Sequence, residues 1–148
     1  MPVSKKDGNP KDVIGSRKWG QFSCLPMDVL TEVSAGLYEG SGKYGRHNYR
    51  VKGVMASVYF DAIMRHLIQW WEGEDIDKDS AQHHLVKLIA GAMVLRSAML
   101  HENWVDDRPP VSDLDFLRET GQKTVDKVIK ENPEFVESYT EINKNNER

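Results

Sequence analysis

Acidic, basic, imidazole and aromatic side chains are concentrated in one segment of the chain, from Lys43 to His84. The densest group of carboxylates in this segment is the run Glu74-Asp75-Ile76-Asp77. Carboxylates this close together repel one another and raise the free energy of the fold unless a cation neutralises them. The basic residues beside them indicate a second, anionic ligand. A divalent metal ion that holds a phosphorylated substrate would satisfy both requirements, and this is the hypothesis that the sequence suggests.

The carboxylates form two groups along the chain. Glu32 and Glu39 are seven residues apart on one face of a predicted helix, where a solvated surface is the commoner explanation for either one alone. The spacing Glu74-x-x-Asp77 suits a hard cation such as Mg²⁺, which also takes phosphate oxygens. The alternative for this second group is an acidic turn between helices. Asp61 is a further carboxylate, four residues before Arg65.

Several basic and polar side chains could contact an anionic ligand. Arginine holds phosphate bidentately and lysine holds it as a point charge. Arg65 could instead pair with Asp61 across one helical turn. The candidates for phosphate are Lys43, Arg46, Arg50 and Arg65. Asn48 carries an amide that could read a base edge or cap a turn.

Two histidines need separate interpretations. His66 borders the apolar band of its predicted helix, which favours a hydrogen-bonded core histidine over a ligand. His84 is close in sequence to the acidic run and could orient a water molecule, touch phosphate or stack on a base. No spaced His pair or second thiolate supports a zinc site, because Cys24 is the single cysteine. Nothing in the sequence indicates a nucleophilic mechanism.

The elements that must position these groups are predicted to be helices. Apolar periodicity predicts a helix from about 26 to 38, ended by Gly40 and Gly42, and a second from about 54 to 71. A third is predicted to begin with Asp79 as its N-cap and to contain the apolar run 88–95, and a fourth to be capped by Ser112. A short segment is expected near 135–142, and no strand pair is predicted. The expected fold is an all-α bundle of four to five helices that associates into oligomers, with an extended arm at 1–24, a core at 25–105 and a C-terminal extension at 106–148.

Composition limits the class of protein. The 148 residues fit one compact domain, and 29% of them are charged, as in ordinary globular proteins. A formal net charge of −3 argues against a protein that binds nucleic acid polymers. No apolar run is long enough to cross a bilayer, and the N-terminus has no hydrophobic signal core. We therefore expect a soluble cytoplasmic protein.

The order of the motifs resembles a known family. The relevant segments are Asn9-Pro10-Lys11-Asp12, Glu32, Lys43-Tyr44-Gly45 with Asn48-Tyr49, Asp61-Ala62, Arg65-His66, Gly73-Glu74-Asp75-Ile76-Asp77, Ser80 and His84. Together they resemble the small phage-encoded dATP/dGTP diphosphohydrolases, relatives of the all-α MazG-like nucleoside triphosphate pyrophosphohydrolases. The resemblance extends from about residue 9 to residue 100.

This resemblance implies an enzyme that converts dGTP or dATP to the monophosphate and pyrophosphate, with Mg²⁺ as cofactor and Mn²⁺ as an alternative. It implies a role in phage control of the nucleotide pool, in the host cytoplasm, and a homo-oligomer (dimer or tetramer). The metal ligands and catalytic carboxylates would be Glu32, Asp61, Glu74 and Asp77. The residues that contact substrate would be Lys43, Tyr44, Arg46, Asn48, Arg65, His66 and His84.

One departure from the family pattern favours a rival interpretation. MazG-like relatives carry Glu-x-x-Glu on the first helix, whereas position 35 of this chain is alanine. The rival is a non-catalytic helical protein that binds a partner or a nucleotide. A nucleotidase of the HD type would need a His-Asp metal pair, which the sequence does not show.

Overall fold

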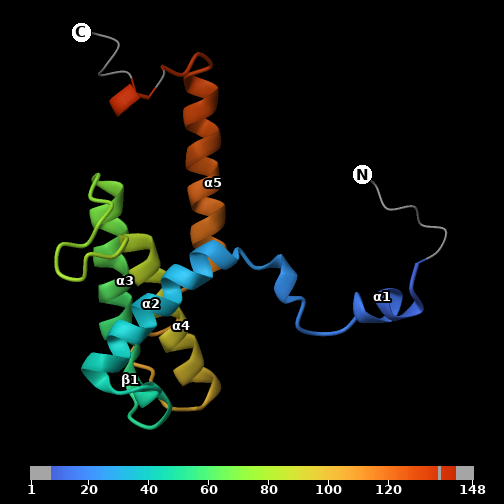
Figure 1. Ribbon diagram of the computed structural model, residues 1–148. Coiled ribbons are helices and arrows are strands. Elements are labelled where there is room, and N and C mark those ends of the chain that lie inside the picture. Colours follow the sequence, from blue (N-terminus) through green and yellow to red (C-terminus); the bar gives the residue numbers. More distant parts are fainter. Residues whose placement is uncertain (1–7, 137, 143–148) are drawn as a thin grey trace. The chain divides into compact units, whose positions relative to one another are not determined.

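The computed structural model describes residues 8–136 and 138–142 and is mainly helical (Figure 1). The chain divides into two compact units, one ending at Arg108 and the other beginning at Pro109. The predicted all-α class is confirmed. The candidate functional residues all lie in the first unit.

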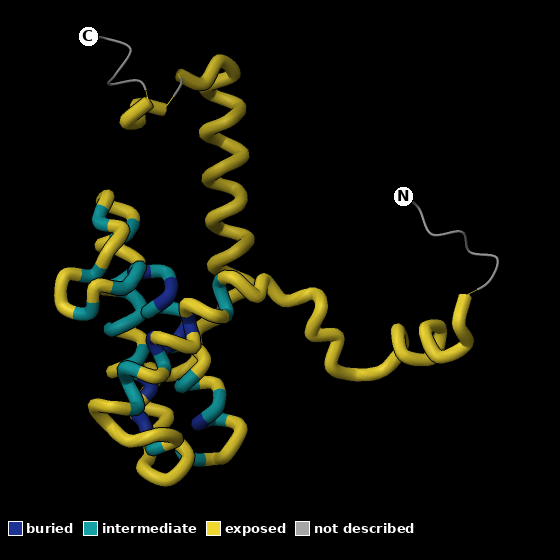
Figure 2. Tube along the Cα trace, viewed as in Figure 1, coloured by how far each residue is buried: buried dark blue, intermediate teal, exposed yellow. Residues whose placement is uncertain are grey.

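Three helices build the core of the first unit: α2 (Met27–Tyr44), α3 (Ala56–Trp71) and α4 (His84–Leu100). Helix α4 packs against both of the others. Val33 of α2 is buried against Val86 and Ala90 of α4, and Figure 2 shows the buried positions gathered where these helices meet. The almost wholly apolar sequence of α4 follows from this central position.

Helix α2 is longer than the sequence predicts. It continues through Gly40 and Gly42 and ends only at Gly45, whose φ is 89°. Glycine is suited to that position because it adopts positive φ without a Cβ clash. A pair of charges four residues apart, Glu39 and Lys43, supports the extra turns. The predicted end near residue 38 is therefore wrong.

Helix α4 begins later than the sequence predicts, at His84 instead of after Asp79. Residues 72–83, between α3 and α4, form a connection across the start of α4, which we call the strap. The backbone N–H of His84 donates to the carbonyl of Asp75 (2.9 Å), and that of Asp77 donates to the carbonyl of Gln82 (2.8 Å). These bonds hold the acidic run against the helix and prevent residues 79–82 from joining it.

A short parallel strand pair, which the sequence did not predict, closes the first unit. Strand β1 (Val54–Met55) pairs with β2 (Trp104–Val105). The pairing brings Asp107 to the start of α3, where its carboxylate accepts the backbone N–H of Ser57 (2.8 Å) and the Ser57 hydroxyl. An acidic side chain that accepts from the first turn caps a helix and complements its dipole.

The ends of the chain also contain helical turns. Within the predicted arm at 1–24, the structure has α1 (Pro10–Gly15) and a 3₁₀ turn (Phe22–Cys24), so that segment is not simply extended. In the second unit α5 (Leu114–Glu131) is capped by Asp113, not by Ser112. Of the segment expected at 135–142, residues 141–142 are helical, and residue 137 lies outside the described residues.

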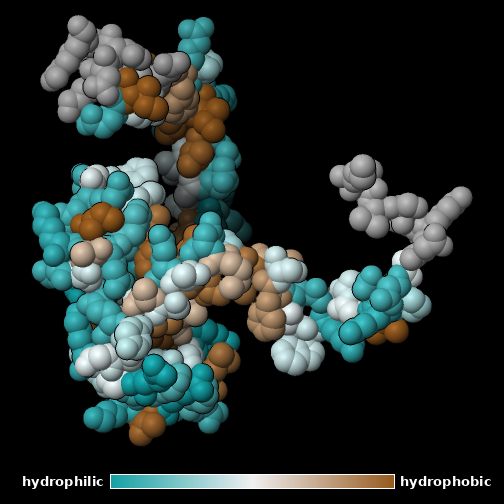
Figure 3. Space-filling view, in the orientation of Figure 1, coloured by the Kyte–Doolittle hydropathy of each residue, from teal (hydrophilic) through white to brown (hydrophobic). Residues whose placement is uncertain are grey.

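The described surface is mixed in character. Figure 3 shows polar side chains over most of the visible face of the helical core, with apolar ones scattered among them. Within the described ranges, no helix combines the length and the apolar character that crossing a membrane requires.

Candidate active site

Side chains from three helices and the strap meet at one end of the core. We call this group the acidic corner. Its members are Glu39, His66, Glu74, Asp77, Gln82, His84 and Lys87. It brings together an acid of α2, a histidine of α3 and the acidic run before α4, which are far apart in sequence.

Glu39 joins α2 to α4. Its carboxylate accepts from Lys43 (2.5 Å), from Lys87 (3.0 Å) and from the side-chain amide of Gln82 (3.0 Å). The hydrogen bond from Lys43, followed by the one from Lys87, lowers the pKa of Glu39. Glu39 therefore remains ionised at neutral pH and holds both lysines in place.

His84 is the one fully buried ionisable side chain among the described residues. Its Nε2 lies 3.1 Å from a carboxylate oxygen of Glu74, and its Nδ1 lies 2.9 Å from Nδ1 of His66. Hydrogen bonds from Lys78 and then from His84 lower the pKa of Glu74. The buried imidazole thus connects the acidic run to α3.

The surroundings also shift the pKa values of two further members of the acidic corner, His66 and Asp77. Burial lowers the pKa of His66, and the nearby charge of Lys87 adds to this effect while Asp77 opposes it. The Asp77 carboxylate accepts the hydroxyl (2.5 Å) and the backbone N–H (3.2 Å) of Ser80, and these bonds lower its pKa. At neutral pH the corner therefore holds an ionised Asp77 beside a neutral His66.

Close packing at Gly36 keeps α2 near the strap. A Cβ at this buried position would lie 2.8 Å from Oε1 of Gln82 and 3.7 Å from Val86. A Cβ at Gly42 of the same helix would meet nothing within 4 Å. Gly36 therefore sets the distance over which Gln82 reaches Glu39.

This difference predicts opposite effects for substitutions at the two glycines. Gly42→Ala should raise the free energy of unfolding by about 0.5–1 kcal/mol, because alanine is the better helix former. Gly36→Val should lower it by about 1–3 kcal/mol, because the side chain overpacks the contact with Gln82 and Val86. Urea unfolding of the two variants measures both changes. Equal stabilisation by the two substitutions would contradict the close packing.

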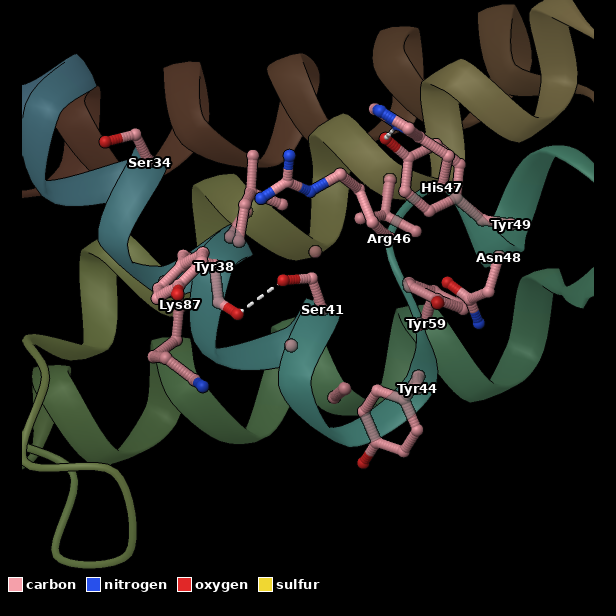
Figure 4. A pocket seen from close by; sticks show the side chains of 18 of the residues that line it. Ser34, Tyr38, Ser41, Tyr44, Arg46, His47, Asn48, Tyr49, Tyr59 and Lys87 are labelled. Carbon is pink, nitrogen blue, oxygen red and sulfur yellow. Dashed lines mark hydrogen bonds between the residues drawn. The ribbon is translucent and has the colours of Figure 1, made fainter.

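A pocket of about 790 Å³ opens beside the acidic corner, between α2, α3, α4 and the loop after α2 (Figure 4). We call it the loop pocket. Its aromatic and polar lining residues are Ser34, Tyr38, Ser41, Tyr44, Arg46, His47, Asn48, Tyr49, Tyr59 and Lys87. The described residues that line it include no carboxylate. Aromatic rings together with the cations of Arg46 and Lys87 are suited to a ligand that joins a planar ring to an anionic group.

The loop itself has a constrained backbone. His47 has a φ of 60°, in the left-handed region that non-glycine residues seldom adopt, and its Nδ1 lies 3.4 Å from the Tyr49 hydroxyl. The side chain of Asn103 donates to the Tyr49 carbonyl (3.0 Å) and ties the loop to the end of α4. Burial raises the pKa of Tyr59, which therefore stays a neutral phenol in the pocket wall.

The structure divides the predicted site residues into three sets. Tyr44, Arg46 and Asn48 line the loop pocket. Lys43, which precedes Tyr44, is hydrogen-bonded to Glu39. His66, Glu74, Asp77 and His84 belong to the acidic corner. Glu32, Asp61 and Arg65 are exposed and form no hydrogen bond or ion pair with any described residue, so the Asp61–Arg65 pair that the spacing allows does not form.

Sequence reasoning missed three members of this region. The sequence pattern places Glu39 on a solvated face and makes Gln82 the second member of a capping box with Asp79. In that pattern Lys87 is only a charged break in the apolar segment 85–100. That interruption was the usable signal, since a charged residue inside a central apolar helix needs a partner, and Lys87 finds one in Glu39.

The carboxylates of the acidic corner are engaged by neighbouring side chains. Across residues 8–136 and 138–142, no three or more His, Cys, Asp and Glu side chains are placed to hold one ion. The carboxylates of Glu39, Glu74 and Asp77 already accept from lysine, histidine or serine. Two predicted ligands, Glu32 and Asp61, have carboxylates without a partner in the described chain. Of these, Glu32 lies one turn before Gly36, on the face of α2 that meets Gln82.

Comparison with known proteins gives one result. Residues 9–108 match the family model described as dATP/dGTP diphosphohydrolase, N-terminal. Comparison with curated proteins and with solved structures gives no match. The matched segment contains every residue of the acidic corner and the loop pocket and ends where the first unit ends. Because the match covers well over half of the chain, this protein belongs to the dATP/dGTP diphosphohydrolase family.

Proposed function

We propose that the chain hydrolyses purine deoxynucleoside triphosphates, dGTP or dATP, to the monophosphate and pyrophosphate. The observation that carries the proposal is the position of Lys87. Its ammonium group is bound to Glu39 in the acidic corner, and the same side chain lines the loop pocket. A nucleotide whose base enters the pocket would therefore place its phosphates at the corner.

The two parts of the site would have different tasks. In the loop pocket Tyr44 and Tyr59 offer aromatic surface, and Asn48 offers an amide for the base edge. At the corner Lys43 and Lys87 would neutralise charge on the phosphates as the bond breaks, which is the main source of catalysis in phosphoryl transfer. Arg46 would supply a further cation from the pocket lining.

We also propose that a divalent ion, Mg²⁺ or Mn²⁺, takes part. Mg²⁺ is commonly bound by one or two carboxylates together with substrate phosphates, and less often by a cage made only of protein ligands. That mode is compatible with a corner whose carboxylates are mostly engaged, because the nucleotide would bring the ion with it. We propose that Glu32, whose carboxylate has no partner among the described residues, is the ligand that receives such a complex.

Product analysis tests the proposal. The purified chain is incubated with dGTP, dATP, dCTP or dTTP and Mg²⁺, and the products are separated by ion-exchange chromatography. We expect deoxynucleoside monophosphate and pyrophosphate from the purine substrates, and no turnover when EDTA is present. Release of inorganic phosphate instead would indicate a different bond, and no turnover of any nucleotide would favour the rival, a non-catalytic binding protein.

The second unit is proposed to serve association and not chemistry. The family match and the first unit both end at Arg108, and α5 has an amphipathic sequence with no buried residue. A chain that ends at Arg108 should keep its kcat for dGTP within about twofold, because it retains the corner and the pocket. Light scattering of the full and shortened chains should show a smaller assembly for the latter. Loss of turnover with an unchanged mass would contradict this assignment.

A further inference from the structure

Asn103 lies just beyond the end of α4 and binds the loop 45–53, which forms one wall of the loop pocket. Its backbone N–H donates to the carbonyl of the buried Ala98 (2.9 Å), so it is joined to the core. Its side-chain amide donates to the Tyr49 carbonyl (3.0 Å), and its own carbonyl accepts the N–H of Val54 (3.4 Å). One residue of the core therefore binds the loop at its middle and at its end.

The amide of Asn103 differs from the other hydrogen-bond partners of the loop. In the part of the chain that the structure describes, the remaining hydrogen bonds of residues 46–52 join residues of the loop to one another, such as the N–H of Lys52 and the carbonyl of Asn48 (2.7 Å). These local bonds give the loop its shape. Its 3₁₀ turn also packs against α4, and the directional bond from Asn103 adds a defined position to that packing.

The backbone is strained on both sides of this bond. Glu102, immediately before Asn103, has a φ of 52°, and His47, two residues before Tyr49, has a φ of 60°. Residues other than glycine seldom adopt such values and keep them where the surrounding contacts impose them. The bond between Asn103 and Tyr49 is a contact of this kind, because it joins the two segments in which the strained residues lie.

The position of the loop matters because of the groups that it carries. Residues 46–49 line the loop pocket, and so do Lys87, Gly91 and Val94 of α4 (Figure 4). Since Asn103 is joined to the end of α4, its bond to the loop sets the distance between these two walls. Asn103 is not among the residues that line the pocket, so any effect on a ligand must pass through the loop.

We propose that Asn103 is a positioning residue that holds residues 46–49 in the arrangement that binds the nucleotide. Without its amide the loop would occupy several positions, and the apparent affinity would fall with the fraction of chains that keep the binding arrangement. The bound complex restores that arrangement, so the chemical step is unchanged. The identity of the ligand rests on the proposed function, whereas the hold of Asn103 on the loop does not.

Hydrogen exchange tests this hold without any substrate. In Asn103→Asp the side chain keeps its size, but an oxygen replaces the amide donor and repels the Tyr49 carbonyl. We expect the backbone amides of residues 50–52 to exchange about tenfold faster than in the wild type, with α3 and α4 unchanged, in mass spectrometry of the full chain. Equal exchange of the loop in the two proteins would overturn the inference even in an active enzyme.

Kinetics then test the consequence for the ligand. In Asn103→Asp we expect KM for dGTP to rise about tenfold while kcat stays within about twofold. A variant that had lost only stability would instead lower kcat, because fewer molecules are folded, and would keep its KM. The matched control is Asn132→Asp in the second unit, where the side-chain amide donates to the Val128 carbonyl (2.9 Å), and neither parameter should change.

The outcomes separate the two proposals. If the wild type turns over no nucleotide while the loop of Asn103→Asp exchanges faster, the proposed function fails and the hold of Asn103 on the loop survives. Asn103→Ala removes the donor without adding charge and decides the case if Asn103→Asp does not fold. An active wild type together with an unchanged KM in the folded variant, whatever its kcat, would contradict the inference.

Discussion

Replacing Lys87 by methionine is expected to lower kcat/KM for dGTP by about 10²–10³-fold. Methionine preserves most of the side-chain volume but removes the one cation that both lines the loop pocket and binds Glu39. The lost interaction is with charge on the phosphates, which is greatest in the transition state, so kcat should fall more than KM rises. Steady-state kinetics with dGTP and Mg²⁺ measure both parameters.

Two comparisons make this prediction specific. Lys127→Met removes a lysine that pairs with Glu131 in the second unit and should leave kcat/KM within about twofold. The fold of Lys87→Met should persist, because Glu39 keeps its bonds to Lys43 and Gln82. If Lys87→Met is folded and retains more than half of the wild-type kcat/KM, the phosphates do not lie at this junction.

Elements with a strong local signal were predicted correctly, and elements set by tertiary contacts were not. The apolar run of α4 and the stripe Val29, Val33 and Leu37 of α2 identify a helical core from periodicity alone. The glycines at 40 and 42 suggested an end to α2, but the helix continues past them to Tyr44 and is capped by Gly45. Local propensity gave the wrong answer there because Glu39 bonds to Gln82 and Lys87 across the fold and to Lys43 one turn later.

The strap before α4 shows a second limit of sequence reasoning. Asp79 and Gln82 have the spacing of a capping box, which predicted a helix from residue 79. In the structure Gln82 instead bonds to Glu39, forty-three residues away, and its carbonyl accepts the N–H of Asp77. A contact between residues so far apart in sequence produces no periodic pattern, so the start of α4 could not be predicted from the sequence.

The candidate site was predictable in composition but not in pairing. The segment from Lys43 to His84 contains most of the corner and most of the aromatic and polar lining of the pocket, as its density of polar and aromatic residues suggested. Glu32 and Glu39 lie on the same face of α2, so periodicity alone does not tell which of them contacts the strap. The structure gives Glu39 the lysines and leaves Glu32 exposed, so the two acids can have different roles.

This difference leads to the second large effect. Glu32→Gln is expected to abolish turnover of dGTP, with kcat/KM lowered by about 10³-fold, while the free energy of unfolding changes by less than about 0.5 kcal/mol. An exposed carboxylate without a partner among the described residues contributes little to the fold, and its oxygens are free to bind a magnesium–nucleotide complex. Kinetics and urea unfolding of the same preparation measure the two quantities.

The neighbouring acid supplies the comparison that decides the matter. Glu39→Gln should lower the free energy of unfolding by about 1 kcal/mol, because two lysines lose their anionic partner, and should reduce activity by displacing Lys87. Glu119→Gln on α5 controls for the change in net charge and should alter neither quantity. A normal rate of dGTP turnover in Glu32→Gln together with an inactive Glu39→Gln would contradict this prediction. The carboxylate that takes part in hydrolysis would then be Glu39. In that case Lys43 and Lys87, which bind Glu39 in the free chain, must bind phosphate instead when the nucleotide enters.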